Sequence, residues 1–288
     1  MAKLTLAACQ FPVTGDPAAN AGYVLRLMRR AARRGAHLAH FSECCLTGYP
    51  GIDFASTADI DWAALRRQTE RVLQAAGELG LWVVVGSAHP LSGAHKPHNS
   101  LYVIDDRGRL VTRYDKLFCF GSAGPEPTLD FLHYSPGSEF ITFDLRGVRV
   151  GLLICHDFRY PETYREYKRR GAQLVLHSFH NAGLTPAESR YYDAQVRVAT
   201  QAAAAANFFW ISVTNASQPQ AHPSFVVDPT GMIAGRLRPH RPGVLITEID
   251  TEAGLWDAAQ YWRERAMAGV LHSGEAVSDP RSADRTSL

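Results

Sequence analysis

Three side chains in this sequence have the chemistry to break an acyl bond together: a cysteine, a glutamate and a lysine. Cys155 follows directly on the apolar run of residues 148–154, and Pro161 opens a helical pattern soon after it. A cysteine between a buried strand and a helix is well placed to be a nucleophile, because helix N-terminal amides stabilise a thiolate and a nearby oxyanion. The position alone does not decide its role, since most cysteines are small buried apolar residues.

Glu43 and Lys116 could supply the two other groups that a thiol needs when it attacks a carbonyl. A base must lie within hydrogen-bond reach of the thiol, and a cation must lie where negative charge develops on the carbonyl oxygen. Taken singly, Glu43 is more simply a structural carboxylate and Lys116 a solvated lysine, because most residues of these types lie at the surface. The catalytic hypothesis depends on the three residues together.

The elements that must position these residues alternate along the chain. Short apolar runs rich in β-branched residues alternate with helical patterns, which is typical of strands covered by helices in an α/β fold. Val24, Leu27, Met28 and Ala31, for example, recur at the spacing of one helix face. Strands are predicted at residues 4–9, 37–41, 81–88, 100–105, 110–114, 148–154, 173–178, 208–214, 224–227 and 244–249, and helices at residues 17–34, 61–79, 161–170 and 186–207.

No internal repeat and no linker interrupts this alternation. We therefore expect a single domain over residues 1–271. Residues 272–288 are polar and are predicted to form a C-terminal tail that either docks on a partner subunit or stays loose.

Five segments of the chain carry the pattern of a known family. They are F-S-E-C-C-L-T-G-Y at Glu43, Y-D-K-L-F at Lys116, G-L-L-I-C-H-D-F-R-Y-P-E at Cys155, and further on A-A-A-N-F-F-W-I-S-V-T-N and S-F-V-V-D-P-T-G. In these segments the chain resembles the nitrilase superfamily, also called the carbon–nitrogen hydrolases, over about residues 3–250. The three motifs that contain Glu43, Lys116 and Cys155, found in this order, are a much more specific signal than any one of them.

The resemblance implies a role for each of the three residues. Glu43 would be the general base for the thiol of Cys155, the Lys116 ammonium would stabilise the oxyanion, and the backbone N–H of His156 would assist. It also implies the fold, a four-layer α-β-β-α sandwich, and the pairing of two such sandwiches through helices into a homodimer or a higher homo-oligomer. No cofactor is expected.

One departure from the family pattern concerns a second carboxylate. The family often has a glutamate a few residues before a Pro-Gly pair, where it orients the lysine. Here the pair is Pro136-Gly137, the sixth residue before the proline is Asp130, and Glu126 lies further upstream. We expect Asp130 rather than Glu126 in this role, and the alternative is that neither is catalytic.

The residues after the nucleophile bear on the substrate. Nitrilases of the family typically have C-W-E there, whereas amidase-like and carbamoylase-like members have C-x-D-x-R followed by an aromatic residue, and this chain has C-H-D-F-R-Y. Amide or N-carbamoyl substrates are therefore expected over nitriles. Arg159 could hold a substrate carboxylate with its guanidinium fork, or equally could pair with Asp157 or Glu162.

Several residues near these motifs are expected to line a substrate pocket. They are His156, His180 and Asn181 after predicted strands, and Tyr49 in the T-G-Y-P-G turn. His177 and His180 form an H-x-x-H pattern that could instead indicate a metal site. Because a strand end does not place residues three apart on one face, as a helix does, the pocket wall is the preferred interpretation and no metal is expected.

Composition limits the classes of protein to which the chain can belong. With 288 residues, 46% hydrophobic and 20% charged, it can bury a large core. Its formal charge is +2 and its basic residues are scattered, so nucleic acid is not an expected partner. No apolar stretch approaches the length of about 18 residues that a membrane span needs, and the first residues lack the cleavage pattern of a secretory signal.

Five cysteines form an odd set without a C-x-x-C pair. This pattern predicts free thiols in a reducing compartment, and hence a cytoplasmic location. The other four cysteines, which do not stand at such a strand-to-helix exit, are expected in the core or in the pocket wall: Cys9, Cys44, Cys45 and Cys119.

The expected function is hydrolysis of an amide or N-carbamoyl carbon–nitrogen bond, other than a peptide bond, in a small molecule. The reaction would pass through a cysteine thioester and release ammonia or an amine. Nitrile hydrolysis, a metal-dependent hydrolase and a catalytically idle ligand-binding scaffold are the alternatives.

Overall fold

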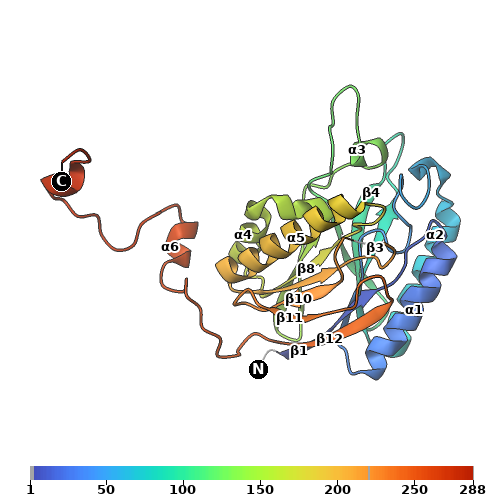
Figure 1. Ribbon diagram of the computed structural model, residues 1–288. Coiled ribbons are helices and arrows are strands. Elements are labelled where there is room, and N and C mark those ends of the chain that lie inside the picture. The colour runs from blue at the N-terminus through green and yellow to red at the C-terminus, as the bar shows by residue number, and fades with distance from the viewer. Residues whose placement is uncertain (1–2, 220, 288) are drawn as a thin grey trace. The chain divides into compact units, whose positions relative to one another are not determined.

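The computed structural model describes residues 3–219 and 221–287 (Figure 1). The chain divides into two compact units between Trp256 and Asp257. The division that we expected from the sequence, between residues 271 and 272, lies further along the chain and stays a prediction. Both sheets and all the candidate catalytic residues belong to the larger unit.

In the described residues of the larger unit, twelve strands form two six-stranded sheets. The first sheet has the order β12-β1-β2-β3-β4-β5, with β1, β2 and β3 parallel and the other neighbours antiparallel. The second has the order β11-β10-β9-β8-β7-β6, with β7, β8 and β9 parallel. The strands are β1 (Lys3–Gln10), β2 (Leu38–His40), β3 (Trp82–His89), β4 (His98–Ile104), β5 (Leu110–Asp115), β6 (Thr142–Leu145), β7 (Val148–Ile154), β8 (Leu174–Ser178), β9 (Trp210–Thr214), β10 (Phe225–Val227), β11 (Ile233–Arg236) and β12 (Gly243–Asp250).

Helices connect the parallel strands and cover the outer faces of the sheets, as parallel neighbours require. The first sheet is covered by α1 (Pro17–Arg33) and α2 (Trp62–Leu79), and the second by α4 (Pro161–Arg169) and α5 (Pro186–Asn207) (Figure 1). The short helices of this unit are η1 (Thr57–Asp59), α3 (Asp130–His133) and η2 (Cys155–Arg159). None of the described helices is long and apolar enough to cross a membrane.

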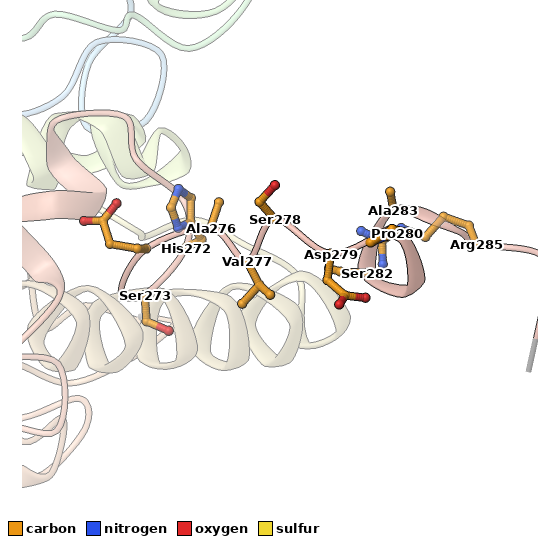
Figure 2. A pocket seen from close by; sticks show the side chains of 11 residues that line it. His272, Ser273, Ala276, Val277, Ser278, Asp279, Pro280, Ser282, Ala283 and Arg285 are labelled. Carbon is orange, nitrogen blue, oxygen red and sulfur yellow. The ribbon is translucent and has the colours of Figure 1, made fainter.

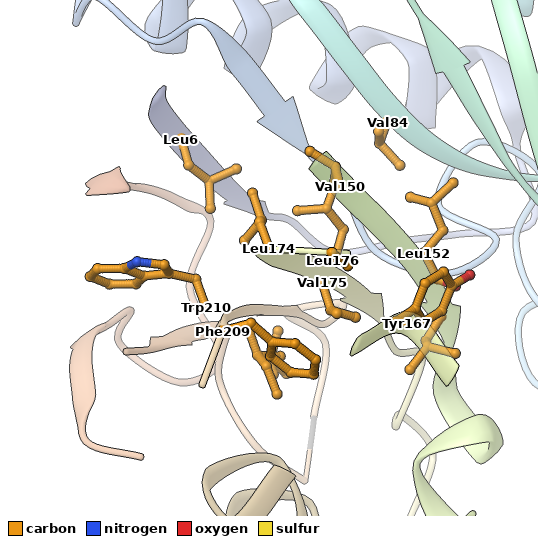
Figure 3. Close-up of a cluster of buried hydrophobic side chains, with 14 of the residues drawn as sticks. Leu6, Val84, Val150, Leu152, Tyr167, Leu174, Val175, Leu176, Phe209 and Trp210 are labelled. Carbon is orange, nitrogen blue, oxygen red and sulfur yellow. The ribbon is translucent and has the colours of Figure 1, made fainter. Parts of the chain in front are cut away.

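Alternate residues of a strand face opposite layers of the unit. On β1, Leu6 belongs to the apolar cluster that also contains Val150 and Leu174 of the second sheet, whereas Ala7 belongs to the cluster beneath α1 and α2. In Figure 3, Leu174 of β8 lies on the side of Leu6, and Val175 points to the opposite side, toward Phe209. The layers are thus helix, sheet, sheet and helix, and the predicted α-β-β-α sandwich is confirmed.

The smaller unit contains two short helices in its described residues, α6 (Arg263–Met267) and α7 (Pro280–Ala283). An open hollow of about 810 Å³ is lined by side chains between His272 and Arg285 (Figure 2). All of these lining residues are exposed. The hollow therefore lacks the enclosure of a ligand site.

Candidate active site

A cavity of about 530 Å³ opens where strand ends from both sheets meet. Cys155 directly follows β7, His180 and Asn181 come soon after β8, and Lys116 directly follows β5. All four line the cavity. The apolar part of its wall includes Ile52, Phe120, Leu129, Leu132, Phe158 and Leu184.

The Lys116 ammonium lies between two carboxylates. Its Nζ donates to Glu43 Oε1 at 3.0 Å and to Asp130 Oδ2 at 2.7 Å, and the lysine side chain is only 1% exposed. Burial alone would lower the pKa of Lys116, but the charges of Asp130 and Glu43 outweigh it and hold the pKa well above its ordinary value. The lysine is therefore a fixed positive charge inside the cavity.

Glu43 is completely buried, and its two carboxylate oxygens differ in their hydrogen-bonding partners. Oε1 accepts from Lys116 and also from Asn99 Nδ2 at 2.7 Å. Within the described part of the chain, Oε2 has no hydrogen-bonding partner at conventional geometry. A buried carboxylate oxygen with unused acceptor capacity is suited to accept a proton from a neighbouring group.

Asp130, and not Glu126, is the second carboxylate at the lysine. Besides Lys116, it accepts from the Tyr49 hydroxyl and from the Phe120 backbone N–H at 2.9 Å. Burial would raise the pKa of Asp130, but Lys116 and these hydrogen bonds hold it below its ordinary value. Glu126 is exposed in the preceding loop.

Cys155 has a left-handed backbone conformation, with φ of +41°. This conformation is strained for a residue with a side chain, and such strain concentrates at functional sites. Its carbonyl oxygen accepts from His177 Nε2 at 3.1 Å, and its Sγ lies 3.6 Å from Asn181 Oδ1. Burial and then the Glu43 charge raise the pKa of the thiol well above its ordinary value, so the resting group is a thiol rather than a thiolate.

Asp157 connects the chain near Lys116 with the chain near Cys155 through hydrogen bonds. Its carboxylate accepts from the backbone N–H of Ile154 at 2.8 Å, from that of Phe118 at 2.9 Å, and from the Tyr114 hydroxyl at 2.7 Å. The first two donors stand next to Cys155 and close to Lys116 in the chain. Burial raises the pKa of Asp157 to about 6.

Comparison with known proteins identifies the family of this chain. The sequence model of the family described as carbon-nitrogen hydrolase matches residues 5–258. This chain belongs to the carbon–nitrogen hydrolases. The resemblance inferred from the motifs around Glu43, Lys116 and Cys155 is thereby confirmed.

Relatives of this carbon–nitrogen hydrolase include ω-amidases of vertebrates. It is 29% identical to that of Mus musculus over 259 residues, which are 87% of this chain and 90% of the relative. To that of Homo sapiens it is 30% identical over 209 residues, 69% of this chain and 74% of the relative.

Solved structures of the same fold include an amidase from Nesterenkonia sp. AN1 of the nitrilase superfamily. One variant of it superposes with a TM-score of 0.76 and 23% identity, covering 92% of this chain and 95% of that one. In another variant, at 22% identity, a TM-score of 0.76 and coverage of 93% and 97%, the acetamide moiety of fluoroacetamide is covalently added at the active-site cysteine.

The predicted pocket residues of the hydrolase fall into two groups. Tyr49, His156, His180 and Asn181 all line the cavity. Tyr49 stacks on His180 with 5.2 Å between ring centroids. Burial, with the nearby Lys116 charge, lowers the pKa of His156 to about 4, so this ring is neutral near pH 7.

Arg159 is not among the residues that line the cavity. Its guanidinium lies over the ring of Phe158 at 4.5 Å and faces that of Tyr192 at 5.6 Å, and both rings are part of the wall. Asp157, one of its two expected partners, uses its carboxylate on the groups described above. The placement therefore supports packing against the wall more than binding of a substrate carboxylate.

Two side chains that contact the site were not singled out from the sequence: Asn99, which donates to Glu43, and His222, which contacts Asn181. These contacts span 56 and 41 positions of sequence, so no local pattern could have indicated them. His177, which was expected in the pocket wall, is not among the lining residues and instead donates to the Cys155 carbonyl. No group of three or more His, Cys, Asp or Glu side chains that could hold a metal ion occurs in the described residues.

Proposed function

We propose that this hydrolase cleaves the carbon–nitrogen bond of a small-molecule amide through a thioester on Cys155, with Glu43, Lys116 and Asp130 as the other catalytic groups. The observation that carries the proposal is the buried Lys116 ammonium, held by Glu43 and Asp130 in the cavity that Cys155 lines. The ω-amidase relatives and the amidases of the same fold support an amide as substrate.

Acylation begins when Glu43 takes the proton of the Cys155 thiol. A base is needed because the resting group is protonated, and Glu43 Oε2 has acceptor capacity for that proton. The sulfur then bonds to the carbonyl carbon, and the carbonyl electron pair moves to oxygen. An ammonium has three N–H groups, two of which Lys116 donates to Glu43 and Asp130, so the third can hold the oxyanion together with the backbone N–H of His156.

Collapse of this intermediate breaks the carbon–nitrogen bond. The leaving nitrogen takes the proton back from Glu43 and departs as ammonia or an amine, and the acyl group stays on Cys155 as a thioester. Glu43 then takes a proton from water, whose oxygen attacks the thioester carbonyl. The carbon–sulfur bond breaks, the sulfur is reprotonated, and the carboxylic acid leaves.

The cavity wall favours an acyl group that is largely apolar and carries no negative charge. Besides Lys116 and Asp130, the charged side chain that lines the cavity within the described residues is Glu188. Its carboxylate is held at the start of α5, where it accepts from Thr185 N and Oγ1. A substrate carboxylate near this group would be repelled.

The test is ammonia release across a panel of small-molecule substrates. The panel contains apolar aliphatic and aromatic amides, ω-amides of carboxylic acids, N-carbamoyl amino acids, and nitriles matched to the amides. We expect release from the apolar amides, and an acid-quenched sample should carry the acyl mass on the Cys155 peptide. A preference for carboxylate-bearing substrates would instead give Arg159 the role suggested by its motif, and release from nitriles alone would overturn the proposal.

We also propose that the chain works as a homodimer or a higher homo-oligomer in the cytoplasm. The exposed apolar side chains of Tyr191 and Val198 on α5 support pairing through this helix. The five cysteines are free thiols, which supports a reducing compartment. Light scattering should give a mass of at least twice that of one chain.

A further inference from the structure

The Asn181 side chain lies between the nucleophile, Cys155, and the buried ring of His222. Its Oδ1 lies 3.6 Å from Cys155 Sγ, and its Nδ2 lies 3.2 Å from His222 Nε2. The backbone of Asn181 is held as well, because its N–H donates to Asn215 Oδ1 at 2.9 Å and its carbonyl accepts from the Ala221 N–H at 3.0 Å. The remaining freedom of this residue is which end of the amide faces the cysteine.

The His222 ring is neutral near pH 7, because burial lowers its pKa to about 4. A neutral imidazole has one donor nitrogen and one acceptor nitrogen. Its Nδ1 lies 3.2 Å from the carbonyl oxygen of Pro223, which can only accept, so Nδ1 carries the hydrogen. Nε2 is then the acceptor, and the end of the Asn181 side chain that it accepts from is the NH₂ group.

We propose that His222 is a positioning residue that keeps the Asn181 carbonyl oxygen turned toward the reacting nitrogen of the substrate. This inference rests on the proposed function. The nitrogen of a primary amide has two N–H groups and so needs two acceptors. Glu43, whose charge acts on the thiol, has a buried acceptor in Oε2, and Asn181 Oδ1 is a second buried acceptor beside the thiol. A reversed Asn181 would instead oppose a donor to a donor.

The preference of the enzyme for an amide over an ester depends directly on the orientation of the Asn181 side chain. An ester with the same acyl group forms the same thioester on Cys155, but its leaving oxygen has no hydrogen to donate to Asn181. Loss of the His222 acceptor should therefore affect the amide and spare the ester. A merely structural role of His222 would affect both substrates alike.

The experiment compares kcat/KM for a primary amide and for the methyl ester of the same acid. We expect His222→Leu to lower the amide-to-ester ratio roughly tenfold, the scale of one lost hydrogen bond. In His222→Gln, the side-chain carbonyl oxygen can accept from Asn181, and the ratio should return to within about threefold of the wild-type value. Equal losses on both substrates in His222→Leu would overturn the inference.

Two further variants separate this role from general effects of losing a buried imidazole. In an Asn181→Ala background, His222→Leu should leave the ratio unchanged, because a residue that acts through Asn181 has nothing left to position. His40→Leu is the matched control: His40 is buried between the sheets, where it contacts Ser178 and Ser212. It should lower the melting temperature without changing the ratio.

The tautomer of His222 can be measured on the wild-type protein, which keeps the test independent of whether a variant folds. Nitrogen-15 NMR should show hydrogen on Nδ1 and none on Nε2, and the opposite tautomer would overturn the inference. If the wild-type protein turns over the ester and no amide, the proposed function fails, and this spectrum still decides the position of the proton.

Discussion

Lys116 and Asp130 form an ion pair of 2.7 Å in which both side chains are about 1% exposed. A buried pair of this kind is costly to break, because the remaining partner becomes an uncompensated charge at a cost of about 3–5 kcal/mol. The pair also explains how an ammonium can be kept in a cavity whose wall is largely apolar. Its consequences for activity and for stability can be separated by substitution.

Asp130→Asn should leave Lys116 protonated but poorly oriented. We expect kcat to fall roughly ten- to hundredfold with little change in KM, because the group acts on the transition state rather than on substrate binding. Glu126→Gln, which removes an exposed carboxylate from the loop before α3, is the control and should be nearly silent. Steady-state kinetics of both variants decide the matter, and similar losses in the two would contradict the role of Asp130.

Lys116→Ala should lower kcat by about two to three decades, the scale of one lost oxyanion donor. It should also lower the melting temperature, because Glu43 and Asp130 are left as neighbouring buried carboxylates. The exposed Lys96 offers a control in which activity and melting temperature should both stay near the wild-type values. A loss of less than tenfold in Lys116→Ala would make this lysine a bystander.

Cys155→Ala should abolish turnover and leave the fold intact, since replacing a thiol by a methyl group leaves only a small cavity. The comparison is Cys9→Ala, whose thiol is buried beneath α1 and α2, away from the cavity. That variant should lose some stability and keep its activity. Ammonia release and thermal melting measure the two effects, and sustained turnover by pure Cys155→Ala would refute the assignment of the nucleophile.

Asp157 makes the stability of the protein depend on pH in a predictable direction. Its pKa in the folded protein is about 6, above the ordinary value of 3.8, so the folded state binds the proton more tightly than the unfolded state. Its contribution is therefore fully present below about pH 4 and is lost as the pH rises to about 6, by about 3 kcal/mol at most. The aspartate of the unfolded chain is already ionised over this interval.

The measurement is the free energy of unfolding of the wild type and of Asp157→Asn, whose side chain does not titrate. We expect the difference between the two to change in favour of Asp157→Asn between about pH 4 and pH 6, and to be constant above that interval. A difference that stays constant from pH 4 to pH 7 would show that the pKa of Asp157 is not raised.

The sequence by itself determined the central strands, the covering helices and the three motif residues. Continuous apolar runs such as β7, Val148–Ile154, are recognisable because both faces of a central strand are buried. Predicted ends of strands and helices agree with the structure to within two residues. The edge strands β6 and β11 were not predicted, since each has four residues and is partly exposed, which leaves little apolar pattern to detect.

Only the tertiary structure decided which side chains meet. The sequence favoured Asp130 over Glu126 only by its spacing from Pro136-Gly137. The fold of this segment brings the Asp130 carboxylate to Lys116 and leaves Glu126 in solvent. It likewise turned Arg159 toward aromatic rings and His222 toward Asn181. Hydrophobic periodicity is a local property that specifies elements, whereas a hydrogen bond or ion pair between distant residues depends on how those elements pack.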